Sequence, residues 1–284
     1  MISGAVAGVI DRALEQAASQ ERPHNFVRWT LKTLADWCYK TFATRFSRET
    51  LRLALKHQGY SWKKAKKLLN KADSARRASF LEQLKPLLEK ATRQERLLVY
   101  IDEAHIHQDT DVSYGWSRKG KRFWVSSDSP GLSAKISFYG VYYFNDGQVR
   151  IWPYPSGRKE HAVNVLERIR QEKPVGAIDL IWDGASWHTA KLVQEAGKRL
   201  DINIIQMPSY SPDFMPVEAL WRWLREDVTY HHCYATAEDL LHAINEFTAR
   251  INQCPMTIAD RLWVKDSLID EEEILRVRKQ PKLE

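Results

Sequence analysis

The chain of 284 residues is poor in cysteine and has no long apolar run. Its three cysteines, Cys38, Cys233 and Cys254, lie far apart and form no C-x-x-C pair, which argues against a disulfide framework and against a zinc knuckle. No stretch of about 18 uncharged apolar residues occurs, so we expect no membrane-spanning helix. The N-terminal residues lack a basic segment and carry charge from Asp11 onward, which predicts an amphipathic helix and not a signal peptide. These absences favour a cytoplasmic protein.

What the chain has in excess is positive charge. Lysine and arginine number 43 against 36 aspartates and glutamates, which gives a net charge of +7 and a pI near 9.2. The hydrophobic fraction of 44% includes 11 tryptophans, enough apolar material for a substantial core. A basic balance favours a polyanionic partner such as nucleic acid, although many basic proteins have no such partner.

The first part of the chain, residues 1–94, has a helical pattern. Apolar residues recur at i, i+3, i+4 and i+7 from Leu31 to Cys38, as on one face of an amphipathic helix. Ser47 is a suitable N-cap for a second helix, which Gly59 would end. Two short helices joined by a tight connection predict a helix-turn-helix at about residues 28–60.

Basic residues lie along the second of these helices and in the linker that comes after it. The four-residue spacing on the helix places three of them along one side, where they would bind backbone phosphates. The alternative is a solvated helix face without a partner. The candidate DNA-binding residues are Arg48, Arg52, Lys56, Lys63, Lys64, Lys66 and Lys67.

From residue 95 the pattern changes to strands that alternate with helices. This order predicts an α/β domain with a mixed sheet over residues 95–255, followed by a charged C-terminal segment, 256–284. The expected strands are 97–104, 121–127, 135–144, 177–183 and 201–207. The expected helices are 159–172, 188–199, 216–228 and 237–253.

Three acidic residues occupy positions at the ends of strands or at the start of a helix, where active-site residues often lie. Asp102 and Asp183 come at the ends of expected buried strands, and Glu218 falls in the first turn of a helix. Converging carboxylates repel one another, and hard divalent cations such as Mg²⁺ relieve that repulsion. Each acid alone also has a simpler interpretation, as a turn-forming or N-cap aspartate or as a glutamate that complements the helix dipole.

The sequence around these acidic residues resembles that of a known family. The segments YIDEAHIHQD, YGWSRKGKR, IWDGASWHTA and PSYSPDFMPVEALWRWLRE resemble the mariner superfamily of DDE transposases. They are most similar to its bacterial insertion-sequence branch, the insertion-sequence six-hundred-and-thirty group. The most specific feature is the interval of 34 residues between Asp183 and Glu218.

The resemblance implies a fold, a cofactor and partners. It implies an RNase H-like catalytic domain in which Asp102, Asp183 and Glu218 bind two Mg²⁺ (or Mn²⁺) ions. It implies cut-and-paste transposition: water hydrolyses a phosphodiester at the element's end, and the freed 3′-OH attacks target DNA, typically at a TA dinucleotide. The implied partners are double-stranded DNA, as terminal inverted repeats and target, and a second copy of the chain on that DNA, at the nucleoid. No small-molecule substrate is expected.

Two features depart from the family pattern. The family usually has L-N-P-[IV]-E before the glutamate, whereas Met215 stands here where the asparagine is expected. Relatives usually carry two helix-turn-helix units, whereas one is evident and residues 1–24 resemble a remnant of the other. We therefore expect altered activity and an incomplete DNA-binding region.

Several neighbouring residues are candidates for supporting roles. Glu103, which should point to the opposite side of its strand, and His105 and His188 are expected near the acids without binding metal. His105 and His107 form an H-x-H pair, a weak zinc alternative. Trp221 and Trp223 cannot share a helix face, so one should be buried while the other stacks on DNA or a partner. Four cations beside Gly120 predict a DNA-gripping β-hairpin tip: Arg118, Lys119, Lys121 and Arg122.

The sequence is also compatible with two other functions. A transposase-derived regulator would bind DNA without catalysis. An RNase H-like nuclease would use the same metal chemistry without strand transfer.

Overall fold

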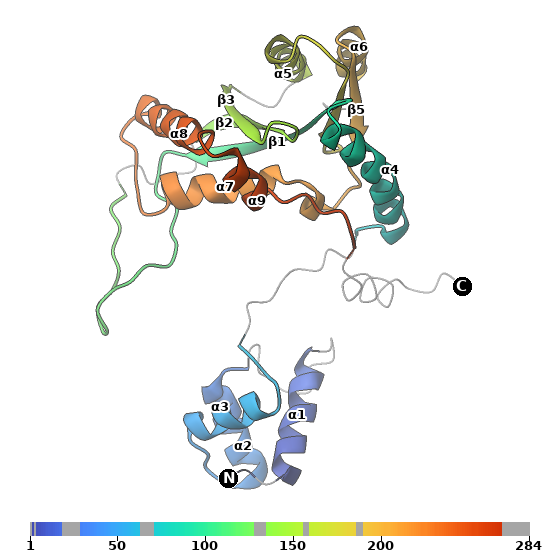
Figure 1. Ribbon diagram of the computed structural model, residues 1–284. Helices are drawn as coiled ribbons and strands as arrows, with labels where there is room; N and C mark the ends of the chain where they lie inside the picture. Colours follow the sequence, from blue (N-terminus) through green and yellow to red (C-terminus); the bar gives the residue numbers. More distant parts are fainter. Residues whose placement is uncertain are drawn as a thin grey trace. The chain divides into compact units, whose positions relative to one another are not determined.

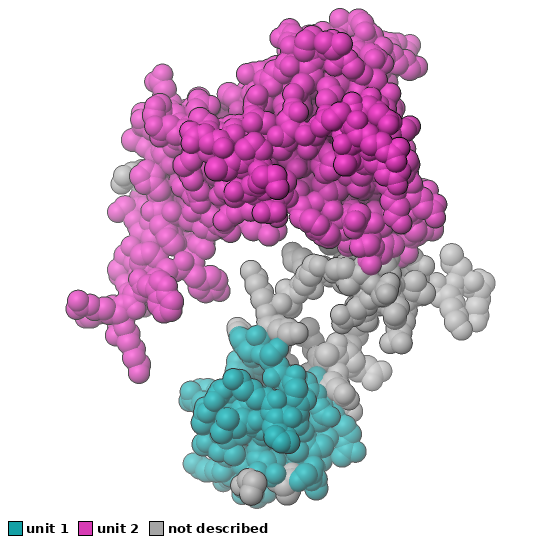
Figure 2. Space-filling view, in the orientation of Figure 1, with its two compact units in different colours: residues 1–67 teal, residues 68–284 magenta. Residues whose placement is uncertain are grey.

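The protein was analysed as a computed structural model that describes residues 2, 4–18, 29–62, 71–127, 135–155, 159–185 and 190–268. Contacts divide the chain into two compact units, residues 1–67 and 68–284 (Figure 2). The second unit therefore includes α4 (Ser74–Thr92), a helix that the sequence pattern places in the helical region 1–94. α4 belongs there because Phe80, Leu81 and Leu84 are buried in the core of that unit.

The first unit contains three described helices, α1 (Gly4–Ala18), α2 (Leu31–Phe42) and α3 (Arg48–His57). The Ser47 hydroxyl caps α3 by accepting a hydrogen bond of 3.0 Å from the Thr50 N–H. α2 and α3 are the two helices that the sequence predicted. α1 is integral to the unit, since its Ile10 packs with Leu34 and Leu51 in one buried cluster.

The second unit is built on a five-stranded mixed sheet in the order β3-β2-β1-β4-β5 (Figure 1). The strands are β1 (Leu97–His107), β2 (Lys135–Tyr143), β3 (Gln148–Tyr154), β4 (Ile178–Trp182) and β5 (Ile202–Gln206). β1 pairs antiparallel with β2 and parallel with β4. The predicted α/β class is confirmed, with short apolar strands in the centre as expected for a sheet covered on both faces.

Helices cover both faces of this sheet and enclose two apolar cores (Figure 1). α5 (Lys159–Glu172) and α6 (Lys191–Arg199) cover one face. α4, α7 (Val217–Leu224), α8 (Ala237–Ile251) and α9 (Pro255–Arg261) cover the other. Successive side chains of β1 alternate between the two cores: Val99 and Ile101 face α5 and α6, whereas Tyr100 and Ile106 face α7 and α8.

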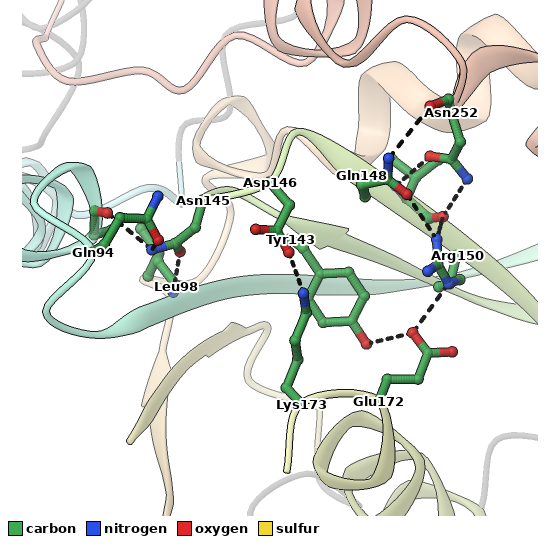
Figure 3. Close-up of polar contacts among 12 residues, drawn as sticks. Gln94, Leu98, Tyr143, Asn145, Asp146, Gln148, Arg150, Glu172, Lys173 and Asn252 are labelled. Atoms are coloured by element: carbon green, nitrogen blue, oxygen red, sulfur yellow. Dashed lines mark hydrogen bonds and ion pairs between the residues drawn. The ribbon is translucent and has the colours of Figure 1, made fainter. Parts of the chain in front are cut away.

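Polar side chains close the end of the sheet where β2 turns into β3 (Figure 3). The Asn145 side chain accepts from the Leu98 N–H at 2.9 Å and donates to the Ala91 and Arg96 carbonyls, each at 2.9 Å. The Asn252 side chain both accepts from and donates to the Val149 backbone at 2.9 Å. These bonds secure α4, α8 and the β2–β3 turn at the end of β1 opposite to Asp102.

Two of the segments predicted in this unit differ in the structure. Residues 121–127 form no strand, because they extend from the domain with residues 112–120 and pair with no neighbouring strand (Figures 1 and 2). We call residues 112–127 the arm. The segment from residue 256 is not a separate charged tail throughout, since Ile258 and Leu262 are fully buried in the core. Within the described ranges, no helix is long and apolar enough to cross a membrane.

Candidate active site

β1 and β4 bring two aspartates to the same edge of the sheet. The strands are parallel, with Tyr100 opposite Ile181. If this register is continued by two residues, Asp102 lies opposite Asp183. β1 itself continues past Asp102, paired with β2 alone. The carboxylates thus follow neighbouring parallel strands at their C-terminal ends, where sites assemble in α/β folds.

Helix α7 brings Glu218 to this edge because it packs across Gly140, the residue of β2 that pairs with Asp102. A Cβ atom at Gly140 would lie 2.5 Å from the Trp221 ring and 2.9 Å from Val217 Cγ1. Glycine is therefore what permits the close approach of helix and sheet. Glu218 lies in the first turn of α7, where its charge complements the helix dipole.

One cavity of about 290 Å³ joins the three acids. Asp183 begins a turn that lines this cavity, and its Oδ1 accepts a hydrogen bond of 3.2 Å from the Ala185 N–H. This is the turn-forming role that an aspartate after a strand commonly has. The lining residues are Asp102, Asp183, Gly184, Ala185, Met207, Pro208, Ser209, Tyr210, Ser211, Pro212, Met215 and Glu218.

The cavity is electrostatically unfavourable for a bare carboxylate at Asp102. Burial raises the pKa of Asp102 to about 7, and the negative charges of Glu218 and Asp183 add to this increase. Hydrogen bonds from the Glu103 backbone N–H and from Trp221 oppose it. The Trp221 bond joins Nε1 to Asp102 Oδ2 at 3.0 Å. A cation among the three acids would relieve the repulsion that remains.

The donor set matches a hard divalent cation, since among the described residues the titratable side chains lining the cavity are three carboxylates and one tyrosine. Within the described part of the chain, no three His, Cys, Asp or Glu side chains are already close enough to hold a metal ion. The carboxylates would have to turn toward one another around it. The same finding gives no support to a zinc site at His105 and His107.

Two of the three candidates for supporting roles, Glu103 and His105, do not line this cavity. Glu103 and His105 alternate with Asp102 along β1 and face the other side of the sheet, as predicted for Glu103 but not for His105. His105 instead shares a hydrogen bond of 2.9 Å between Nδ1 and Ser137 Oγ. His188 lies outside the described residues.

Both tryptophans of α7 are buried, so the prediction that one of them stacks on DNA is wrong. Trp223 packs edge-on against Phe247, with ring centroids 5.7 Å apart, and Arg261 lies over its ring. Trp221 is the residue whose role sequence reasoning missed. Its position one helical turn after Glu218, at i+3, was the available signal.

The predicted DNA-binding cations differ in their surroundings. Arg48 and Lys56 on α3 are exposed, whereas Arg52 pairs with Glu49 through a bond of 2.8 Å. Lys63, Lys64, Lys66 and Lys67 lie outside the described residues. The exposed cations of the arm are Arg118, Lys119, Lys121 and Arg122.

The tip of the arm is a turn but not a β-hairpin. Its Lys121 N–H donates to the Arg118 carbonyl at 2.9 Å, and Gly120 has a φ of 81°. No strands flank this turn.

Comparison with known families decides the assignment. A family model described as DDE superfamily endonuclease matches residues 97–241, half of the chain, and spans Asp102, Asp183 and Glu218. The chain belongs to the DDE superfamily of endonucleases. A second family model, described as winged helix-turn helix, matches residues 25–84 of this DDE endonuclease. The search of curated proteins found no match to this chain.

Solved structures show the same fold for this DDE endonuclease at low sequence identity. The Mos1 transposase paired-end complex with left transposon end is 17% identical with a TM-score of 0.62, over 86% of this chain and 70% of that one. The Mos1 strand transfer complex is 16% identical with a TM-score of 0.63, over 90% and 74%. The Mos1 mariner paired end complex with Mn is 17% identical with a TM-score of 0.61, over 90% and 75%. The predicted fold, an RNase H-like domain preceded by a helix-turn-helix module, is confirmed.

Proposed function

We propose that this DDE endonuclease is a transposase that cuts DNA at the ends of a mobile element and joins them to target DNA. One observation carries the proposal: Asp102, Asp183 and Glu218, from two strands and a helix far apart in sequence, line a single cavity. The names of the similar structures, which include a transposon end and a strand transfer complex, support it.

The chemistry assigned to this cavity is metal-dependent phosphodiester transfer. Asp102, Asp183 and Glu218 would hold two Mg²⁺ or Mn²⁺ ions, which would supply positive charge to the phosphate and to the entering and leaving oxygens. Mos1 complexes with Mn and with Mg are among the similar structures. Trp221 would hold Asp102 in the orientation that faces the cavity.

The reaction needs no covalent enzyme intermediate. In the first step a water oxygen forms a bond to phosphorus, and the 3′-oxygen of the element's end leaves with a proton. In the second step that 3′-OH attacks a phosphodiester of target DNA and forms a new P–O bond, and the target 3′-oxygen leaves with a proton in place of the one that the attacking hydroxyl loses. The bonds broken and formed are equal in kind, so strand transfer requires no external energy source.

We further assign the chain to the mariner-like bacterial insertion-sequence branch, on the motifs and the 34-residue interval between Asp183 and Glu218. This assignment implies TA targets, inverted terminal repeats, and a homodimer that forms on DNA at the nucleoid. Met215 is buried and lines the cavity in place of the asparagine of that branch. Its thioether offers no strong hydrogen bond to the neighbouring acids, so we expect slower catalysis than in relatives.

DNA binding is assigned to two sets of cations. On α3 the exposed Arg48 and Lys56 would act with Arg52, and they are followed in sequence by Lys63, Lys64, Lys66 and Lys67. On the arm, Arg118, Lys119, Lys121 and Arg122 would grip the backbone near the cleavage site. Glu49 lowers the charge available from Arg52, so Arg48 and Lys56 should contribute more.

A single assay separates this proposal from its alternatives. Purified protein is incubated with Mg²⁺ and labelled DNA that carries the element's terminal repeats. A joined product supports the transposase, cleavage without joining supports the RNase H-like nuclease, and binding without cleavage supports the regulator.

A further inference from the structure

Three charged residues from distant segments meet beside the wall of the carboxylate cavity. Arg77 of α4 binds the Asp213 carboxylate with both terminal nitrogens, at 3.0 Å and 2.9 Å. Lys265, which follows α9, donates to Oδ2 of the same carboxylate at 2.6 Å. Asp213 lies in the short 3-10 helix Pro212–Phe214.

This cluster is unusual in its burial. The Arg77 side chain is fully buried and that of Lys265 is 6% exposed. Both cations also lie over the Phe214 ring, at 4.5 Å and 5.6 Å from its centroid. Phe80 packs on the same ring at 5.3 Å. Apolar side chains of similar size often give equal or greater stability at such a place, so stability alone does not account for the cluster.

A short run of backbone hydrogen bonds connects the cluster to the cavity. The Phe214 N–H donates to Ser211 at 3.1 Å, and the Met215 N–H donates to Pro212 at 3.0 Å. The Glu218 N–H then donates to Met215 at 3.1 Å. Ser211, Pro212, Met215 and Glu218 all line the cavity. Holding Asp213 therefore holds the cavity wall and the first turn of α7.

We propose that Asp213 is a positioning residue for the metal site, held by Arg77 and Lys265 so that Glu218 faces Asp102 and Asp183. This inference rests on the proposed function of the three carboxylates. The cluster acts by positioning Glu218. Arg77 and Lys265 are not among the groups that shift the pKa of Asp102. It also makes the chain up to Lys265 part of the catalytic unit.

The chain offers a matched control for the loss of a buried ion pair. Asp179 at the start of β4 is 2% exposed and accepts from Arg96 at 2.5 Å and 3.0 Å. It lies at the opposite end of β4 from Asp183 and does not line the cavity. Asp179→Asn should therefore lower the Tm, as Asp213→Asn should, without disturbing the carboxylates.

The test is calorimetric titration of the full-length, DNA-free protein with Mn²⁺. We expect the wild type to bind, Asp183→Ala to lose binding, and Asp213→Asn to bind on the order of tenfold more weakly, as for other residues that orient metal ligands. Lys265→Met, which keeps the Arg77–Asp213 pair, should weaken binding in the same direction. Lys265→Arg should restore it, and Asp179→Asn should bind like the wild type.

The outcomes are distinguishable. If Lys265→Met and Asp213→Asn bind Mn²⁺ as tightly as the wild type, or if Asp179→Asn weakens binding equally, the positioning role is wrong while the metal site stands. Should Asp213→Asn fail to fold, the comparison of Lys265→Met with Lys265→Arg still decides the question. If the wild type and Asp183→Ala bind alike, the metal site itself is wrong, and the positioning role with it.

Discussion

The indole nitrogen of Trp221 donates a hydrogen bond of 3.0 Å to Oδ2 of Asp102. Helix α7 thereby holds Asp102 of the central strand β1 through a side chain that is buried in the apolar core. The bond stabilises the charged form of a carboxylate whose pKa burial raises to about 7. Trp221 is 2% exposed, so the bond lies in a largely buried environment.

Replacing Trp221 by phenylalanine should impair cleavage more than folding. The ring volume is largely kept, but a hydrogen bond to a charged group, worth roughly 1.5–3 kcal/mol, is lost. We expect the rate of Mg²⁺-dependent DNA cleavage to fall roughly tenfold. The matched control is Trp223→Phe, which removes a bond of 3.2 Å to Asp227, away from the cavity. Equal cleavage rates in the two variants would contradict this role for Trp221.

Replacing Gly140 by alanine should have a similar effect through packing. The added Cβ would displace Trp221, which lies within 2.5 Å of it, and so break the contact with Asp102. We expect slower cleavage and a loss of about 1–3 kcal/mol of unfolding free energy from overpacking. Gly8→Ala, whose Cβ meets nothing within 4 Å, is the control and should retain both properties. Unchanged cleavage in Gly140→Ala would show that the helix can shift without cost.

Stability should fall in acid partly through Asp213. Burial alone would raise the pKa of Asp213, but hydrogen bonds and charges from Arg77 and Lys265 outweigh it and hold the pKa well below its usual value of 3.8. A carboxyl whose pKa is lower in the folded state stabilises the protein above its unfolded pKa, and this contribution is lost as pH falls below about 4.

Chemical denaturation between about pH 7 and pH 3 measures this contribution. We expect the unfolding free energy of the wild type to decrease more steeply below about pH 4 than that of Asp213→Asn, which has no carboxyl to protonate. Parallel curves for the two proteins would contradict the assignment.

DNA binding by the helix-turn-helix should depend on salt through Arg48 and Lys56. Each phosphate contact contributes a slope of about −0.9 to log K against log[salt]. We expect Arg48→Ala and Lys56→Ala each to weaken binding and to reduce that slope by about 1. Arg12→Ala, on α1 outside the helix-turn-helix, should leave the slope unchanged. An unchanged slope in all three variants would remove α3 from the DNA interface.

Local signals in the sequence predicted much of this fold. The helix predicted at residues 159–172 is α5 without change of bounds, and the cap at Ser47 begins α3 as expected. Apolar strands at 97–104 and 177–183 correspond to β1 and β4. These elements depend on periodicity and capping, which neighbouring residues determine.

What failed depends on partners far away in the chain. Residues 121–127 have the aromatic and β-branched composition of a strand, but no neighbouring strand pairs with them. The contact between Trp221 and Asp102, and the meeting of Arg77, Asp213 and Lys265, join residues that only the folded chain brings together. Composition predicts propensity, whereas pairing is decided by tertiary structure.

Asp183→Ala tests whether the three carboxylates form one metal-dependent catalytic site. The measurement is Mg²⁺-dependent cleavage of labelled terminal-repeat DNA, with DNA binding measured in parallel. We expect Asp183→Ala to bind this DNA as the wild type does and to cleave none of it. Full cleavage by Asp183→Ala would show that the three carboxylates are not the catalytic site.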